Sequence, residues 1–148
     1  YIFLLAKSER YYFDQGAIQE PVAAGTVARL SQPLLAEQEG SDRVPGKTNG
    51  PMKAVGGAVT RNKRDVWTVT TKPFKGAHFA TFPPDLIEPC ILAGCPEGGI
   101  VLDPFGGAGT TGLVADRLQR DAILIELNPE YAAMAERRIR GESPLFAA

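Results

Sequence analysis

The pattern of apolar and polar positions becomes regular after about residue 76. Residues 100–102 and 122–125 are short apolar runs between turn residues, which is typical of buried strands. Three segments carry helix signals, over residues 83–93, 110–120 and 129–140. Asn128 is the predicted cap of the last helix, and Gly141 is predicted to lie beyond its end. Its apolar face is predicted to hold Tyr131, Met134, Ala135 and Ile139. The order of strand, glycine loop, helix and strand predicts a βαβ unit in an α/β fold.

The first 75 residues are less regular. Residues 1–7 are apolar and aromatic and predict a strand, and Tyr11–Phe13 predict a second one that pairs with it as an edge hairpin. Residues 20–65 hold many glycines and prolines without a sustained period, which predicts a long irregular insertion with a short helix within 26–38. Residues 66–69 predict a short strand or extended piece. The expected divisions are edge strands over 1–19, the insertion over 20–65 and a patterned portion over 66–148.

Composition narrows the class of protein. The chain has 148 residues, 44% of them hydrophobic and 22% charged, which excludes wholesale disorder, a coiled coil and a collagen-like repeat. No run long enough to span a membrane and no signal peptide is apparent. Cys90 and Cys95 are too few for a disulfide framework or a complete zinc site, so buried free thiols and a cytosolic location are expected. Tyr1 begins in the middle of a strand-like run, which indicates a fragment of something longer.

Charge is distributed unevenly along the chain. The formal net charge is −1, but residues 43–75 carry eight basic side chains and a single acid, Asp65. The segments on either side of this stretch are both net acidic. Such local asymmetry is typical of a segment that faces a polyanion, and a solvated lysine-rich loop is the alternative.

The glycine-rich loop and two carboxylates indicate a nucleoside cofactor. Gly107, Gly109 and Gly112 match the dinucleotide spacing, and Glu126 lies about twenty residues after the first strand, where an acid can bind ribose hydroxyls. Asp103 ends that strand, and its carboxylate would repel a pyrophosphate but attract a cation. The sulfonium and ammonium groups of S-adenosylmethionine satisfy this condition. The alternatives are a cap or turn former for Asp103 and a solvated acid for Glu126.

Several segments resemble one enzyme family in the same order. They resemble the C-terminal portion of the β-type, permuted DNA amino-methyltransferases of restriction-modification systems or phages. The resemblance covers nearly the whole chain except about residues 20–60, and it rests on residues 1–8, 11–14, 61–67, 78–83, 101–112 and 125–131. It implies a partial Rossmann-like class I methyltransferase sheet with an irregular target-recognition insertion, and it makes residues 66–148 the cofactor-binding portion.

The resemblance also implies an activity. Such enzymes transfer a methyl group from S-adenosylmethionine to the exocyclic amino group of adenine or cytosine in DNA, after the base has been flipped from the duplex. The expected partners are double-stranded DNA and the remainder of the methyltransferase chain, without a membrane and with a homodimer left open. The expected location is the cytoplasm, at the nucleoid. No metal site is expected.

The site residues follow from the same motifs. The implied cofactor-binding residues are His78, Phe79, Ala80, Thr81, Phe82, Asp103, Pro104, Phe105, Gly107, Gly109, Thr110, Thr111, Glu126, Leu127 and Asn128. The candidates for DNA contact are Lys53, Arg61, Lys63 and Arg64.

Two side chains leave alternatives open. His78 is the sole histidine and is expected to form a wall of the cofactor site, with a structural hydrogen-bonding role or acid–base catalysis as alternatives. Trp67 is expected in the core, with stacking on a base as the alternative.

One departure from the family concerns catalysis. The family's Asp-Pro-Pro-Tyr tetrapeptide has no match, because Phe82-Pro83-Pro84-Asp85 has the wrong order. The resemblance places the tetrapeptide upstream of Tyr1, so no catalytic residue is assigned and the chain alone is expected to be inactive. The competing hypotheses are a stand-alone DNA- or cofactor-binding remnant and a nucleotide-dependent oxidoreductase.

Overall fold

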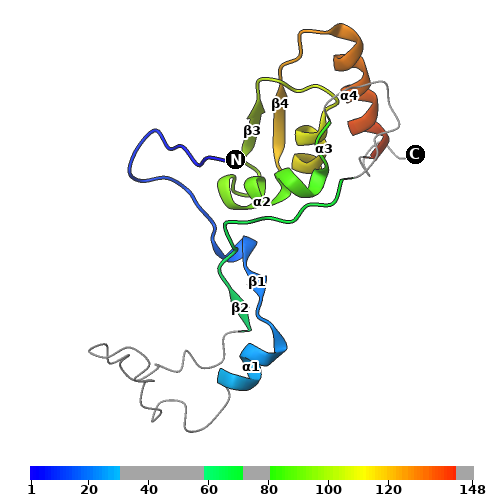
Figure 1. The fold of residues 1–148 in the computed structure, drawn as a ribbon. Helices are drawn as coiled ribbons and strands as arrows, with labels where there is room; N and C mark the ends of the chain where they lie inside the picture. Colours follow the sequence, from blue (N-terminus) through cyan, green and yellow to red (C-terminus); the bar gives the residue numbers. More distant parts are fainter. Residues whose placement is uncertain (31–58, 72–80, 143–148) are drawn as a thin grey trace. The chain divides into compact units, whose positions relative to one another are not determined.

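The computed structural model describes residues 1–30, 59–71 and 81–142. The chain divides into two compact units, one made of residues 1–18 with 64–148 and the other of residues 19–63. The larger unit contains the regular elements that the sequence predicts after residue 76, and each unit is considered by itself (Figure 1).

A parallel pair of strands forms the centre of the larger unit. β3 (Ile100–Asp103) pairs with β4 (Asp121–Leu124), and Asp103 lies opposite Leu124 in the register. The helix α3 (Thr110–Arg117) connects the two strands, and it packs against both of them. This arrangement confirms the predicted βαβ unit and an α/β class for the described part of this unit. Since the strands are parallel, their carboxyl ends and the loops that follow lie at one edge.

Two further helices flank this unit. α2 (Pro84–Gly94) begins with a proline in its first turn and ends before Cys95, as predicted. α4 (Pro129–Glu142) begins after Asn128, whose Oδ1 accepts the Glu130 amide at 2.9 Å and so confirms the predicted cap. The prediction that Gly141 lies beyond the helix end is wrong. The helix instead continues through Gly141 to Glu142, which pairs with Arg117 of α3.

The core of the larger unit lies between α2, α3 and one face of the strands. Ile91, Cys95, Val114 and Ala115 form its buried cluster, and Val101 of β3 packs against it. The prediction of buried free thiols is confirmed for Cys95, whereas Cys90 is half-buried. Burial raises the pKa of the Cys90 thiol.

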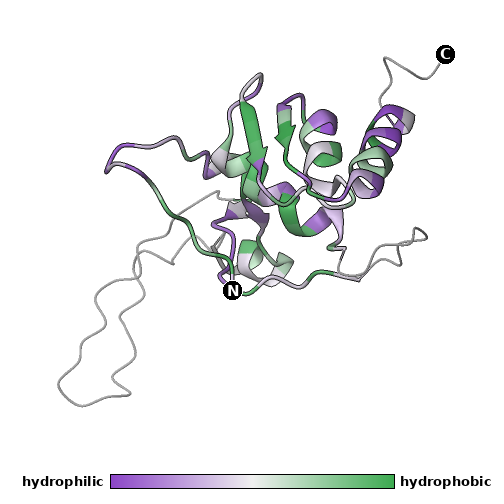
Figure 2. Ribbon diagram, turned by 90° about the horizontal axis from the view of Figure 1, so that it is seen from above, coloured by the Kyte–Doolittle hydropathy of each residue, from purple (hydrophilic) through white to green (hydrophobic). Residues whose placement is uncertain are grey.

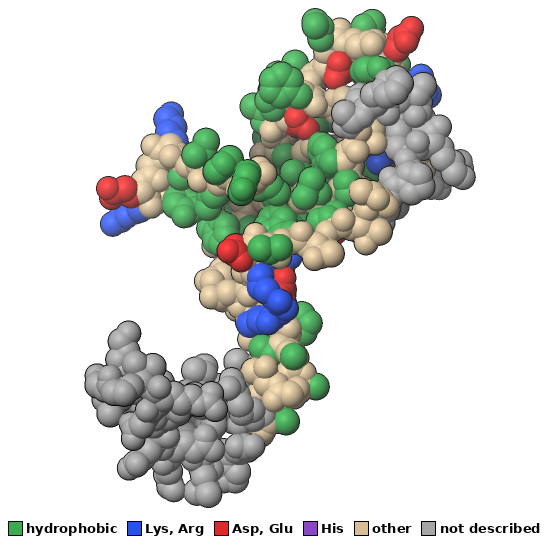
Figure 3. Space-filling view, in the orientation of Figure 1, with side chains coloured by type: hydrophobic (Ala, Val, Ile, Leu, Met, Phe, Trp, Pro, Cys, Tyr) green, Lys and Arg blue, Asp and Glu red, His purple; other side chains and the backbone are tan. Residues whose placement is uncertain are grey.

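The other face of the strand pair carries exposed apolar side chains. Apart from Asp103 at the end of β3 and Asp121 at the start of β4, both strands are hydrophobic, and α3 and α4 lie to the same side of them (Figures 1 and 2). Ile100, Leu102, Ile123 and Ile125 are 63%, 62%, 53% and 56% exposed. Hydrophobic side chains accordingly gather around the β3–β4 pair on the surface (Figure 3). The described part of the chain therefore buries the predicted strands on one face only, because no described element covers the other.

The N-terminal segment differs from its prediction. Residues 1–15 contain no strand and are almost entirely exposed, so the predicted edge hairpin is absent from this structure. Among its aromatic side chains, Tyr1 stacks on Phe3 with ring centroids 6.2 Å apart. The backbone is tied to α2 where the Asp14 amide donates to the Ala93 carbonyl at 2.8 Å, just before the 3-10 turn η1 (Gly16–Ile18). Without a partner strand an apolar run has no ladder to join.

Residues 66–69 also form no strand among the described residues. Trp67 is only half-buried, and its indole Nε1 donates to the Arg64 carbonyl at 2.8 Å. The favoured expectation of a core tryptophan is therefore met only in part.

The smaller unit is described only near its ends. β1 (Glu20–Pro21) and β2 (Thr60–Arg61) pair in antiparallel fashion, with Glu20 opposite Arg61. α1 (Ala24–Leu30) overlaps the start of the helix predicted within 26–38, and the rest of that prediction lies outside the described residues. In the parts of both units that the structure describes, no helix is long and apolar enough to cross a membrane.

Candidate functional site

The candidate site is the loop between β3 and α3, at the carboxyl ends of the strands. Gly107 and Gly109 both have positive φ, 49° and 74°, which few other residues adopt. The loop is fastened to the chain after β4 because the Gly106 amide donates to the Ile125 carbonyl at 2.8 Å. A Cβ added at Gly109 would stand 2.7 Å from the Ala135 Cβ. Glycine is therefore required at 109 both by conformation and by the close approach of α4.

Asp103 is held by two donors from the chain that follows it. Its Oδ1 accepts the Phe105 amide at 2.9 Å, and its Oδ2 accepts the Thr111 hydroxyl at 2.6 Å. The first contact is the turn-forming role that the sequence leaves open as an alternative for this residue. The turn does not exhaust the carboxylate, which has about four acceptor positions. Asp103 thus shapes the loop and keeps acceptor capacity at the strand end.

Glu126 joins the two loops at this edge. Its Oε2 accepts the Gly107 amide and its Oε1 accepts the Asn128 amide, both at 2.8 Å. The side chain is half-buried, so it is more than a solvated acid at a strand end. The two carboxylates that the sequence singles out are brought to the same loop: Asp103 begins it and Glu126 holds its middle.

The remaining predicted cofactor residues fall into three groups. Phe105 and Leu127 are 86% and 98% exposed at the strand ends, and Pro104 is exposed beside them. Thr110 and Thr111 are buried, and their hydroxyls hydrogen-bond within the protein. Thr81 is half-buried and Phe82 exposed, just before α2, while His78, Phe79 and Ala80 lie outside the described residues.

Sequence reasoning missed Arg138, which reaches the loop from α4. Its Nη1 donates to the Ala108 carbonyl at 3.1 Å and to Thr110 Oγ1 at 2.9 Å. Partial burial lowers the pKa of its guanidinium, an effect that Arg117 reinforces and Glu142 opposes. The position of Arg138 on the helix could have indicated this contact, because Arg138 follows Ala135 by three positions and so lies on the same face.

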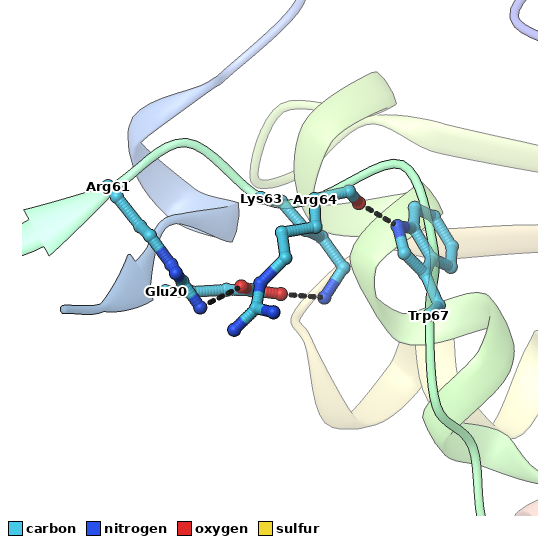
Figure 4. A network of polar contacts seen from close by, with 5 residues as sticks. All are labelled: Glu20, Arg61, Lys63, Arg64 and Trp67. Carbon is cyan, nitrogen blue, oxygen red and sulfur yellow. Dashed lines mark hydrogen bonds and ion pairs between the residues drawn. The ribbon is translucent and has the colours of Figure 1, made fainter. Parts of the chain in front are cut away.

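The candidates for DNA contact are partly paired with an acid in this structure. Figure 4 shows Glu20 between Arg61 and Lys63, at 3.3 Å from the Arg61 Nη2 and 3.5 Å from the Lys63 Nζ. These three residues belong to the smaller unit. Arg64 belongs to the larger unit and is exposed, and Lys53 lies outside the described residues. A single carboxylate therefore offsets part of the charge of two predicted contacts.

Comparison with known proteins places the chain in a family. The family described as DNA methylase matches residues 1–137. The type II methyltransferase M.Cfr9I of Citrobacter freundii is 43% identical over 142 residues, which are 96% of this chain and 36% of that protein. The type II methyltransferase M.SmaI of Serratia marcescens is 40% identical over 139 residues, 94% of this chain and 37% of that protein. The chain thus spans little more than a third of the length of these relatives.

Solved structures of methyltransferases are also similar in part. The M1.HpyAVI–SAM complex is 36% identical, with a TM-score of 0.42 over 52% of this chain and 41% of that one. The cytosine-N4-specific PvuII DNA methyltransferase is 34% identical, with a TM-score of 0.38 over 49% of this chain and 33% of that one. The match to the family along most of the chain, with relatives at 40% identity or more, shows that this chain belongs to the DNA methylase family.

Proposed function

We propose that this chain is the cofactor-binding portion of an S-adenosylmethionine-dependent DNA methyltransferase with a Rossmann-like class I sheet. The methyl acceptor is the exocyclic amino group of adenine or cytosine. The observation that carries the proposal is the pair of carboxylates at the carboxyl ends of adjacent parallel strands, both hydrogen-bonded to one glycine-rich loop. Ligands of open parallel sheets bind at this edge.

The residues at the loop fit the chemistry of S-adenosylmethionine. Asp103 supplies negative charge that suits a sulfonium and an ammonium group and disfavours a pyrophosphate. Glu126 is a half-buried carboxylate beside the loop, and a charged acceptor strengthens hydrogen bonds from ribose hydroxyls. The ribose hydroxyls then bind at Glu126, and the exposed Phe105 and Leu127 supply apolar contact for the adenosine. When bound, the cofactor supplies the activated methyl group.

The partners belong to the same proposal. The basic residues of the 43–75 segment face the phosphates of double-stranded DNA, and the remainder of a methyltransferase chain covers the exposed face of β3 and β4. The names of the relatives, all type II methyltransferases, support a restriction-modification role in a bacterial cytoplasm. The homodimer and the wall formed by residues 78–82 stay predictions.

The proposal is tested by titration calorimetry of the 148-residue chain with S-adenosylmethionine and, separately, with NAD. Asp103→Asn and Glu126→Gln should each weaken binding of S-adenosylmethionine by about 1–3 kcal/mol, the scale for removing a charged hydrogen-bond partner. Asp121→Asn is the matched control, because it removes an exposed carboxylate at the opposite end of β4.

Two outcomes would contradict the proposal. Wild-type affinity in both site variants would place the ligand elsewhere. Tighter binding of NAD than of S-adenosylmethionine would favour the oxidoreductase alternative.

A further inference from the structure

Arg138 makes a side-chain contact between α4 and the glycine loop that the proposed function does not use. Its Nη1 lies 3.1 Å from the Ala108 carbonyl and 2.9 Å from Thr110 Oγ1. Ala108 and Thr110 are both buried, each 4% exposed. A buried carbonyl or hydroxyl that loses its partner is costly, so these acceptors depend on what the guanidinium provides.

A second contact, one turn earlier on α4, supports the same loop. Ala135 is buried against Gly109, and a Cβ at that glycine would stand 2.7 Å from the Ala135 Cβ. Residues three positions apart share one face of a helix, so Ala135 and Arg138 approach the loop from the same side. α4 therefore supports the loop by close packing at Gly109 and by hydrogen bonds on either side of it.

The loop is held from two sides by groups of opposite charge. Glu126 accepts the Gly107 amide at 2.8 Å, and Arg138 donates to the carbonyl of the next residue, Ala108. Two peptide groups of the loop, 106–107 and 108–109, are thus fixed in orientation, the first through its N–H and the second through its C=O. An arginine suits this position because the two hydrogens of one terminal nitrogen can serve two acceptors.

We propose that Arg138 is a positioning residue that fixes the glycine loop in the shape that binds the cofactor. It acts through Ala108 and Thr110. The inference rests on the proposed function for its ligand, but the immobilisation of the loop is independent of any ligand.

The experiment compares Arg138→Met, Arg138→Lys and Arg137→Met in the 148-residue chain. Methionine keeps the apolar stem and removes the donors, whereas lysine restores a donor. Arg137 is the matched control because it is exposed at the neighbouring position of the same helix. Affinity for S-adenosylmethionine is measured by calorimetry, and amide hydrogen exchange of residues 106–110 is measured without ligand.

Arg138→Met should lose about tenfold or more in affinity, as expected for a charged hydrogen bond, and the loop amides should exchange faster. Arg138→Lys should recover part of both effects, and Arg137→Met should show neither. If Arg138→Met does not fold, Thr110→Val removes one acceptor without changing the shape of the side chain and should produce a smaller loss of the same kind.

The outcomes separate this inference from the proposed function. Wild-type affinity in Arg138→Met would overturn the inference even if stability fell, since a merely structural role lowers stability alone. Unchanged exchange of the loop amides would overturn it as well. If the wild-type chain does not bind S-adenosylmethionine, the proposed function fails, while the exchange measurement still decides whether Arg138 holds the loop.

Discussion

At the scale of single residues, the site combines ligand chemistry with loop construction. The place of Asp103 and Glu126 in the site can be predicted from their spacing, because the carboxyl ends of adjacent parallel strands lie at the same edge of a sheet. Their hydrogen-bond partners could not be predicted, since the Gly107 amide that Glu126 accepts is 19 residues earlier in the sequence. Arg138 was missed for a similar reason, because its acceptors are 28 and 30 residues away.

The basic residues allow a prediction about DNA. Replacing Arg61, Lys63 and Arg64 by alanine should weaken binding of a mixed-sequence duplex. The logarithmic salt slope should flatten by about 0.9 for each phosphate that the variant no longer neutralises. Glu20→Gln should strengthen binding, because it removes the carboxylate that pairs with Arg61 and Lys63. Fluorescence anisotropy at a series of salt concentrations measures both effects, with Glu97→Gln as a control for net charge.

An unaltered salt slope in the triple variant would show that these charges are only a solvated surface. An unaltered affinity in Glu20→Gln would show that the ion pairs do not compete with phosphate, as is common for partly exposed pairs.

At the scale of elements, the sequence pattern predicted the helices and strands whose positions depend on neighbouring residues. α2, β3, α3 and β4 follow their proline, glycine and apolar patterns closely, and the cap at Asn128 forms as expected. The predictions that were wrong concern segments whose structure depends on contacts with residues far away in the sequence. The last turn of α4 includes Glu142, which pairs with Arg117 of α3, and residues 1–15 pair with no strand among the described residues. Burial of the strands on both faces requires a second layer, which the described residues do not supply.

The glycine loop provides a test at this scale. Gly109→Ala should destabilise the chain because alanine must adopt a φ of 74° and its Cβ would meet Ala135 at 2.7 Å. Gly98→Ala is the matched control, since Gly98 has a φ of 70° and nothing within 4 Å of the added Cβ. Backbone strain costs about 1–3 kcal/mol in both, and overpacking adds about 1–3 kcal/mol only at 109. Urea unfolding measures the difference, and equal losses would mean that α4 moves away without cost.

At the scale of the molecule, the larger unit is a layered fold with one face covered. Val101 and Leu124 face the helices, whereas Ile100, Leu102, Ile123 and Ile125 remain exposed. An apolar patch of this kind marks an interaction surface or a liability to aggregate. The relatives M.Cfr9I and M.SmaI are nearly three times as long as this chain.

This face allows a prediction about association. Leu102→Thr with Ile123→Thr should reduce self-association and dye binding of the isolated chain, because it removes exposed apolar area, while threonine is β-branched and suits a strand. Stability should change by less than about 0.5 kcal/mol, as is usual for exposed positions. Light scattering and dye fluorescence measure the effect, and Val101→Thr on the covered face is the control that should lose stability. If self-association were undiminished, the surface responsible would lie elsewhere, for example on the aromatic residues 1–13.

The hydrogen bonds of the glycine loop also have a consequence for the folding of the site. The hydrogen bonds that hold it join residues 8, 19, 28 and 30 positions apart, so each closes a short stretch of chain. Closing a stretch of this length costs less chain entropy than closing a longer one. These four contacts all lie within residues 103–138, so none of them requires the segment between 19 and 63 to be in place first.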